Sequence, residues 1–274
     1  MRYYVVSDVH GFYDELIRAL EEKGFFEDTQ PNKLIVCGDL MDRGTKAAEL
    51  QDFIMKLLGE GRLIFIRGNH EDLLVKMLCD IEERAFDDFG MADFERGSSY
   101  HVKNGTWSTA LQLANMQPRY AIVRPRPFVA KVRQTDFYKK LLPAAVNYFE
   151  TKNYVFVHGW IPCTSNGANN SYRAFKTFTY NPGWREATGD DWYFARWYNG
   201  MEFACKKRIL VPGKTVVCGH WHTSYGHSVI EGIGSEFDTG ADFSPFKAEG
   251  ILAIDACTAV SGQVNCVVIE DAEV

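Results

Sequence analysis

The chain opens with RYYVVSDVHG (residues 2–11), an apolar, β-rich run that ends in a polar cluster. Two further apolar runs end the same way, KLIVCGDLMDRG (residues 33–44) and LIFIRGNHE (residues 63–71). A helical pattern of apolar residues follows each of the three clusters. This strand–helix order predicts an α/β fold with a mostly parallel sheet, in which ligands bind beyond the carboxyl ends of the strands.

Two later apolar runs also end in histidines. Residues 154–157 lead into His158, and residues 215–218 lead into GHWH (residues 219–222). We therefore expect the same edge of the sheet to be used twice more. Within residues 250–269, two apolar runs around a Ser-Gly pair predict a β-hairpin that closes a sheet.

A long segment without such a cluster separates the third helical stretch from the first late histidine. We predict that residues 79–153 are partly helical and form a lid-like insertion within a single domain, residues 1–274. From residue 96 to residue 135 the insertion has no acidic residue, and its basic residues are Arg96, Lys103, Arg119, Arg124, Arg126, Lys131 and Arg133. This local reversal of charge fits either an ordinary solvated surface or a lid whose field favours an anionic substrate.

Composition excludes several classes of protein. With 46% hydrophobic and 24% charged residues the chain is typical of an ordinary globular protein. Its net charge of −6 repels nucleic acid and anionic membranes, so we expect no nucleic-acid binding. The N-terminus does not resemble a signal peptide, and no apolar run is long enough to span a membrane. We therefore expect a cytoplasmic protein that does not bind membranes.

Metal-ligating side chains gather at the predicted strand ends. Asp8, Asp39 and Asn69 lie there, together with five of the seven histidines, His10, His70, His158, His220 and His222. Imidazole, carboxylate and amide ligands in one set suit Mn²⁺, Fe or Zn²⁺. The set is too large for one ion, so we expect two divalent transition-metal ions, with Mn²⁺ first among them. Two ions roughly 3.5–4 Å apart need a bridging ligand, and Asp39 is the candidate because it follows the second of the three ligand-bearing strands.

In order along the chain, the motifs are Asp-x-His-Gly, Gly-Asp-x-x-Asp-Arg-Gly, Gly-Asn-His-Glu, His-Gly and Gly-His. This set resembles that of the calcineurin-like metallophosphoesterase superfamily, and the Asp-Arg-Gly ending resembles its bacterial phosphoprotein phosphatase branch, which is similar to Ser/Thr phosphatases. The resemblance covers the first 71 residues and then two short islands. It implies a metallophosphoesterase-type β-sheet sandwich that is flanked by helices and carries a helical insertion.

The resemblance also implies a role for individual residues. The first metal ion would be held by Asp8, His10 and Asp39, with His222 completing the site. The second would be held by Asp39, Asn69, His158 and His220. His70 would be the general acid, with Asp42 orienting its imidazole. Substrate would be bound by Arg43, whose planar guanidinium suits phosphoryl oxygens, and by Asn69.

A second phosphate-binding arginine normally follows the first late histidine in this family. Arg173, Arg185 and Arg196 are eligible, and we favour Arg196. It lies in the aromatic stretch at residues 192–197, which could either stack a nucleobase or a peptide side chain or pack in the core. In the insertion, NGTW (residues 104–107) resembles an Asn-Gly-Gly and Thr segment of bacterial members, with the second glycine missing.

Three functions remain open from the sequence. The first is a dinuclear metal-dependent phosphoesterase that hydrolyses phosphate monoesters, such as a serine/threonine protein phosphatase. The second is a bis(5'-nucleosyl)-tetraphosphatase, since the basic insertion would suit a substrate with several negative charges. The third is a pseudoenzyme that binds a partner, which the intact acid, bridging carboxylate and arginine disfavour. For either enzyme the expected partner is a phosphorylated substrate.

Overall fold

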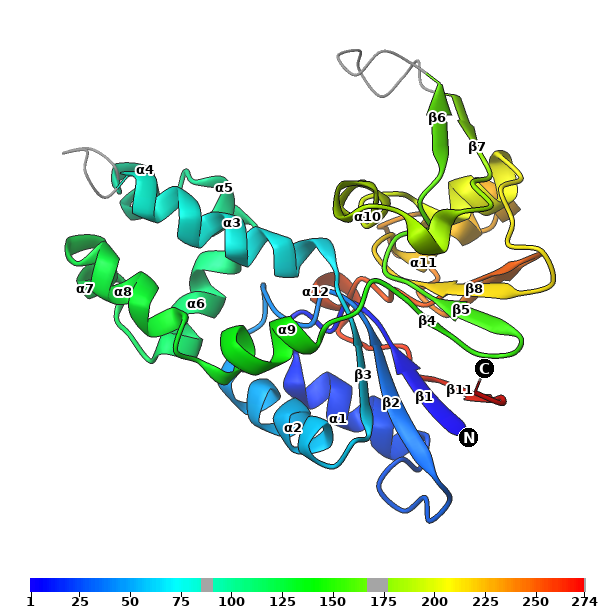
Figure 1. Cartoon of the computed structure of the whole chain (residues 1–274), viewed down its shortest axis with the longest axis horizontal. Coiled ribbons are helices and arrows are strands. Elements are labelled where there is room, and N and C mark those ends of the chain that lie inside the picture. The colour runs from blue at the N-terminus through cyan, green and yellow to red at the C-terminus, as the bar shows by residue number, and fades with distance from the viewer. Residues whose placement is uncertain (85–90, 167–176, 274) are drawn as a thin grey trace.

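The computed structural model describes residues 1–84, 91–166 and 177–273, and its strands form two main sheets (Figure 1). The first sheet has the strand order β11, β1, β2, β3, with bounds Val267–Glu270, Arg2–Val6, Asn32–Cys37 and Leu63–Ile66. β1, β2 and β3 run parallel to one another, whereas β11 pairs with β1 in the antiparallel direction. The three strands predicted at the start of the chain are thus confirmed, and β2 lies between the other two.

The second sheet has the order β4, β5, β8, β10, β9, with bounds Phe149–Glu150, Tyr154–Phe156, Thr215–Cys218, Ile251–Ala253 and Phe246–Ala248. β5, β8 and β10 are parallel, and the two outer strands are antiparallel to their neighbours. The late apolar runs are therefore strands, but of a second sheet. The predicted C-terminal hairpin is wrong, because β10 and β11 belong to different sheets and a long connection with α12 (Thr258–Ser261) joins them.

The two sheets pack face to face, which confirms the predicted sandwich. Side chains alternate along β1, so that Tyr3 and Val5 point into the space between the sheets, with Phe156 and Val217 from the second sheet. Their neighbour Tyr4 faces the opposite way and packs in the core beneath the helices. β1, β2 and β3 are therefore apolar on both faces, as the continuous apolar runs of the sequence require.

Helices cover the outer face of the first sheet. α1 spans Tyr13–Glu22, α2 spans Ala47–Gly59 and α3 spans Asn69–Arg84. Each of the three follows one of the parallel strands, and buried residues of α1 and α2 lie in the same core as the outward residues of the sheet. Figure 1 shows α1 and α2 beside the blue strands, with α3 leading away from the end of β3.

The predicted insertion forms a run of helices, some of which pack on α3. They are α4 (Ala92–Glu95), α5 (Tyr100–Lys103), α6 (Thr106–Ala114), α7 (Pro118–Val123), α8 (Pro125–Val132), the π-helix η1 (Phe137–Leu141) and α9 (Leu142–Ala144). Trp107 and Phe128 belong to the same hydrophobic core as α2 and α3. The helical prediction is therefore confirmed, whereas the single-domain division and the lid-like role remain predictions.

The remaining elements surround the second sheet. They are β6 (Thr164–Asn166), β7 (Thr177–Thr179), the 3₁₀ helix η3 (Trp184–Glu186), α10 (Gly189–Ala195), the π-helices η4 (Glu202–Lys206) and η5 (Gly226–Glu231), and α11 (Thr223–Tyr225). Trp184 and Trp192 are buried against this sheet, so Trp192 packs in the core, whereas Phe194 is 57% exposed. Among the described helices, none is long and apolar enough to cross a membrane.

Candidate active site

The polar clusters that follow the parallel strands of both sheets lie close together, at the carboxyl ends of those strands. The ligand atoms of His10, Asp39 and His70 lie within 4.8 Å of one another, and so do those of Asp39, His158 and His220. Asp39 belongs to both groups because β2 is the central parallel strand of its sheet. The two sheets therefore share one centre, which neither could build alone.

The two carboxylate oxygens of Asp39 face different histidines. Its Oδ2 lies 3.9 Å from His10 Nε2, and its Oδ1 lies 3.4 Å from His158 Nε2. The other predicted ligands lie at the same place: Asp8 Oδ1 is 3.9 Å from His10 Nε2, and Asn69 Oδ1 is 2.8 Å from His158 Nε2. A carboxylate between two sets of ligands has the geometry that a bridging ligand needs.

Backbone carbonyl groups orient two of the imidazoles. His10 Nδ1 lies 3.0 Å from the carbonyl oxygen of Met41, and His158 Nδ1 lies 2.8 Å from that of Cys37. A carbonyl oxygen only accepts hydrogen bonds, so each Nδ1 carries the proton and donates it. Nε2 is then the nitrogen that faces the centre, where it could bind a metal ion once it has lost its proton.

The charges at the centre favour cations. Burial raises the pKa of Asp8 to about 6. Burial also raises the pKa of Asp39, but the neighbouring His158 and His70 outweigh it and hold that pKa well below its usual range. For His158, burial lowers the pKa, yet the carboxylate of Asp39 raises it to about 10. Buried carboxylates that attract protons onto nearby imidazoles are also suited to bind divalent cations, which displace those protons.

A histidine–aspartate pair lies at the rim of this centre. His70 Nδ1 is 2.7 Å from Asp42 Oδ2, and His70 Nε2 is 3.4 Å from Arg43 Nη2. Burial lowers the pKa of His70, but Asp39 and Asp42 outweigh it and raise the pKa above the ordinary histidine value. The Nη1 atom of Arg43 lies 2.9 Å from His10 Nε2. The arrangement can therefore hold a proton and present a guanidinium beside the two clusters.

Strained backbone supports these loops. Non-glycine residues with positive φ angles include Asp8 (52°), His10 (52°), Asp39 (52°), Asp42 (79°), Arg43 (67°) and His220 (66°). Such left-handed conformations persist only where the surrounding structure holds them. Gly68 shows how tightly the loops pack, because a Cβ atom there would lie 2.8 Å from Glu71 and still closer to Asp39. The loops after β2 and β3 can approach this closely only with glycine at that position.

His222 lies outside both clusters within the described part of the chain. Its Nε2 is 2.7 Å from Glu236 Oε1, and its ring centre is 4.6 Å from that of Phe237. The structure thus shows His222 hydrogen-bonded to a neighbouring loop, and its role as a ligand stays a prediction.

The arginines proposed as second phosphate ligands have other partners. Arg196 is buried, and its guanidinium donates to Asp72 Oδ2 (2.7 Å) and Asn147 Oδ1 (2.6 Å). Arg185 donates to both oxygens of Glu150, and Arg173 lies outside the described residues. Phosphate binding by Arg196 stays a prediction, and it would require the buried ion pair with Asp72 to open.

The basic residues of the insertion also include one that faces away from the centre. Arg133 forms two hydrogen bonds of 2.6 and 2.7 Å with Glu82. Glu82 lies about 18 Å along α3 from His70, at about 1.5 Å per residue. The charge of Arg133 is thus neutralised far from the clusters, which weakens the interpretation of the insertion as a focusing field.

Glu71 is a structural residue that sequence reasoning left without a role. Its buried carboxylate accepts hydrogen bonds from the backbone N–H groups of Gly68 (2.7 Å), Asp39 (3.0 Å) and Leu40 (3.0 Å). It therefore ties the loop after β3 to the loop after β2. In the sequence, the sign of this role was an acidic residue directly after the Asn-His pair.

We expect Glu71→Gln to lower the free energy of unfolding by about 1–3 kcal/mol. The amide can keep the two bonds of Oε2, but its NH₂ group then faces the N–H of Leu40, which leaves a buried donor unpaired. Urea denaturation of the metal-free protein measures the change. Glu83→Gln, at an exposed position of the same helix, is the control. Equal stability of the two variants would show that Glu71 does not hold the loops together.

Asp255 is a second buried carboxylate at this edge that sequence reasoning missed. It follows β10, and its Oδ1 accepts a hydrogen bond of 2.7 Å from the N–H of Cys257. Burial and the nearby charge of Asp8 raise its pKa to about 8. The signal for it was the acidic residue at the end of another apolar run, the same pattern that identified Asp8.

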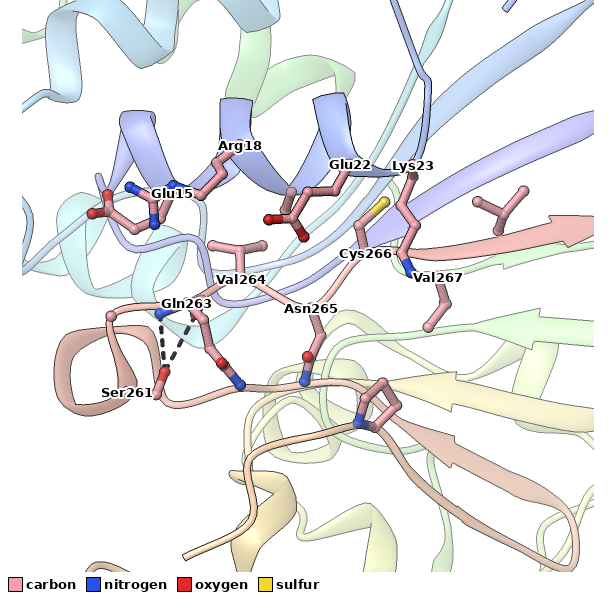
Figure 2. Close-up of a pocket in the computed structure, with 14 residues that line it drawn as sticks. Glu15, Arg18, Glu22, Lys23, Ser261, Gln263, Val264, Asn265, Cys266 and Val267 are labelled. Atoms are coloured by element: carbon pink, nitrogen blue, oxygen red, sulfur yellow. Dashed lines mark hydrogen bonds between the residues drawn. The ribbon is translucent and has the colours of Figure 1, made fainter. Parts of the chain in front are cut away.

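A separate hollow of about 790 Å³ lies between α1 and residues 261–268. Figure 2 shows Glu15, Arg18 and Glu22 of α1 and the following Lys23 along one side, with Gln263 and Asn265 opposite. None of its lining residues belongs to the two ligand clusters. We therefore place the candidate active site at the strand ends and not in this hollow.

Two stacked sheets with buried histidine–carboxylate clusters at their parallel strand ends define a class, the α/β proteins whose strand ends can hold metal ions. Residues 1–224 match the family model of the calcineurin-like phosphoesterases. The chain belongs to that family, which uses divalent metal ions. The resemblance seen in the motifs and the fold class that it implied are both confirmed.

Several curated relatives are named as bis(5'-nucleosyl)-tetraphosphatases, of an asymmetrical or a symmetrical kind. A bis(5'-nucleosyl)-tetraphosphatase PrpE (asymmetrical) from Bacillus velezensis is 28% identical over 144 residues, 50% of this chain and 51% of that protein. A symmetrical bis(5'-nucleosyl)-tetraphosphatase from Salmonella paratyphi A is 36% identical over 81 residues, 30% of this chain and 27% of that protein. The chain thus spans about half the length, or less, of these relatives. The structure of a cold-active protein tyrosine phosphatase from a Shewanella species is 15% identical, covering 98% of this chain and 75% of that chain, with a TM-score of 0.47.

Proposed function

We propose that this protein is a dinuclear metal-dependent phosphoric ester hydrolase that acts on phosphate monoesters. One observation carries the proposal: two buried clusters share Asp39, and the His70–Asp42 pair and Arg43 lie directly beside them. A partner-binding pseudoenzyme would need neither the proton-holding pair nor the guanidinium at this place.

The ligand sets follow from this geometry. Asp8, His10 and Asp39 would hold one ion, with His222 as a further ligand, and the other would be held by Asp39, Asn69, His158 and His220. When bound, two divalent transition-metal ions supply Lewis acidity and a water whose pKa falls toward about 7. Mn²⁺ is our first expectation for this donor set, with Fe or Zn²⁺ as the alternatives.

The protein's own side chains would carry the remaining steps. The guanidinium of Arg43 would bind the phosphoryl oxygens through paired N–H donors, with Asn69 at the substrate as well. His70 would hold a proton at Nε2 and donate it to the leaving oxygen, while Asp42 accepts the Nδ1–H and holds the imidazole in position. The raised pKa of His70 agrees with this role, because the acid must be protonated before the bond breaks.

A second candidate substrate is a dinucleoside tetraphosphate. The names of the curated relatives favour it, and so do two half-buried indole rings near the candidate metal centre. The ring centres of Trp197 and Trp221 lie 5.8 and 6.1 Å from that of His220. Aromatic rings beside a phosphate-binding site can stack a nucleobase, and each stacked base contributes about 1–3 kcal/mol.

A side-by-side assay distinguishes these substrates. We would load the protein with Mn²⁺ and compare kcat/KM for p-nitrophenyl phosphate, a panel of phosphoserine and phosphothreonine peptides, and diadenosine tetraphosphate. We expect hydrolysis of the monoesters that stops on chelation and returns with Mn²⁺. A kcat/KM that is highest for diadenosine tetraphosphate would replace the monoesterase proposal by the second candidate. No hydrolysis of any substrate by protein with two bound ions would contradict both.

A further inference from the structure

We propose that helix α6 of the insertion is a positioning element of the active site, in which Thr106 orients Asp42 and, through it, His70. This inference rests on the proposed function, because it gives Thr106 a part in proton donation by His70. It also gives the insertion a task other than providing positive charge.

The sequence of α6 places a polar stripe on a buried face of the helix. Thr106, Thr109 and Gln112 recur at intervals of three residues and therefore lie on one side. Thr106 and Thr109 are 0% and 1% exposed, so their hydroxyl groups need partners inside the protein. If α6 only packed against its neighbours, apolar side chains would be sufficient at these buried positions. The polar stripe therefore indicates a specific hydrogen-bonded contact.

The stripe makes hydrogen bonds to the segment from Asp42 to the start of α2. Thr106 Oγ1 donates a hydrogen bond of 2.7 Å to Asp42 Oδ2, and the N–H of Asp42 donates one of 2.9 Å to Thr109 Oγ1. Further along, Gln112 donates to the carbonyl of Gly44 (3.1 Å) and accepts from the N–H of Ala47 (2.9 Å). Four hydrogen bonds from one helix thus hold the loop from Asp42 to Ala47.

The start of α6 also lies directly against the backbone of Arg43. Gly105 has a φ angle of 86°, and a Cβ atom at that position would lie 2.8 Å from Arg43 Cα and closer still to its N atom. Only glycine allows this approach. The helix therefore supports the loop at both of its functional residues.

Asp42 needs this support for two reasons. It and Arg43 have left-handed backbone, which a loop does not keep without outside contacts. In addition, Asp42 Oδ2 accepts hydrogen bonds from His70 Nδ1 and from Thr106 at the same time. The hydroxyl thereby fixes the direction of the carboxylate, and the carboxylate fixes the plane of the imidazole.

The test removes the hydroxyl without changing the shape of the side chain. Thr106→Val should lower kcat for an alkyl phosphate, a poor leaving group, by about tenfold or more, as outer contacts of active-site groups typically do. For p-nitrophenyl phosphate, which hardly needs an acid, the loss should stay within about threefold. Thr106→Ser keeps the donor and should restore the rate. Thr135→Val, which removes a hydroxyl bonded to the carbonyl of Val132 in the same insertion, is the control.

Two further measurements separate positioning from a general loss of structure. In a His70→Ala background, Thr106→Val should have no additional effect on kcat, because the two residues act as one unit. In the metal-free protein, the hydrogen-bonded Nδ1 proton of His70 should give a low-field NMR signal that Thr106→Val shifts or removes and Thr106→Ser keeps. Equal losses for both substrates, an additive effect, or an unchanged signal would overturn the positioning role. A wild-type protein that hydrolyses no phosphoester would instead contradict the proposed function, and the NMR result would still test Thr106.

Discussion

Asp39→Asn is expected to remove most of the bound metal and to lower kcat/KM for p-nitrophenyl phosphate by at least about a thousandfold. The carboxylate is the member common to both ligand clusters, and its two oxygens face different histidines. An amide has one neutral acceptor oxygen and cannot bridge two cations. Metal-ion catalysis contributes several kcal/mol, and each 1.4 kcal/mol is about a factor of ten in rate.

Elemental analysis of the purified protein, together with the kinetics, measures this effect. The wild type should bind close to two transition-metal ions, and the variant should lose affinity at both sites. Asp52→Asn, on the exposed face of α2, should keep both the metal and the activity. Loss of one ion alone would contradict the bridging role of Asp39. A fully active wild type with one ion or fewer would contradict the dinuclear mechanism.

His70→Ala is the other variant with a large expected effect. We expect kcat for an alkyl phosphate to fall by about 10²–10⁴-fold, the usual contribution of a positioned general acid. The expected loss for p-nitrophenyl phosphate is much smaller, because p-nitrophenolate leaves readily without a proton. The imidazole is held by Asp42 at 2.7 Å and its pKa is raised above the ordinary histidine value, which favours the protonated form that a general acid needs.

The comparison of the two leaving groups is the measurement, with metal content as the internal check. Because His70 also belongs to one of the clusters, the variant must be shown to retain both ions. His227→Ala removes a histidine whose partners are Glu231 and Ser244, and it should affect neither substrate. A similar loss for both substrates, with metal retained, would mean that His70 positions the substrate or water and does not supply the proton.

The strands and the meeting of their ends were predictable from the sequence. Apolar runs that end in Asp8, Asp39 or His158 show both the strand and its polar end, and parallel strands deliver those ends to one side. The partner of a strand is harder to predict. The runs at residues 251–253 and 267–270 look like a hairpin, but β11 pairs with β1, because hydrophobic alternation says that a strand is half buried and not which neighbour covers its edge.

The contribution of the insertion was not predictable in the same way. Its excess of basic residues suggested an electrostatic role, but charge counts do not reveal that Arg133 pairs with Glu82. Thr106 was noted only as part of the NGTW segment, without a role, and Thr109 was not noted, because threonine in a helix can face solvent, core or a polar partner. Arg196 was favoured from its position after His158, and only the folded chain brings Asp72 within 2.7 Å of it.

Several non-glycine residues of the candidate active site have left-handed backbone conformations, and these set catalytic activity against thermal stability. Each such non-glycine residue stores of the order of 1–3 kcal/mol of strain, and glycine at the same position would release much of it. A laboratory selection for thermal tolerance alone should therefore enrich Arg43→Gly, at an exposed position, but not Asp42→Gly, which would leave the buried donors of His70 and Thr106 unpaired. Proteins recovered in this way would be more durable than the parent and poor catalysts. Any programme to stabilise this enzyme should keep these positions fixed and seek its gains in the outer helices.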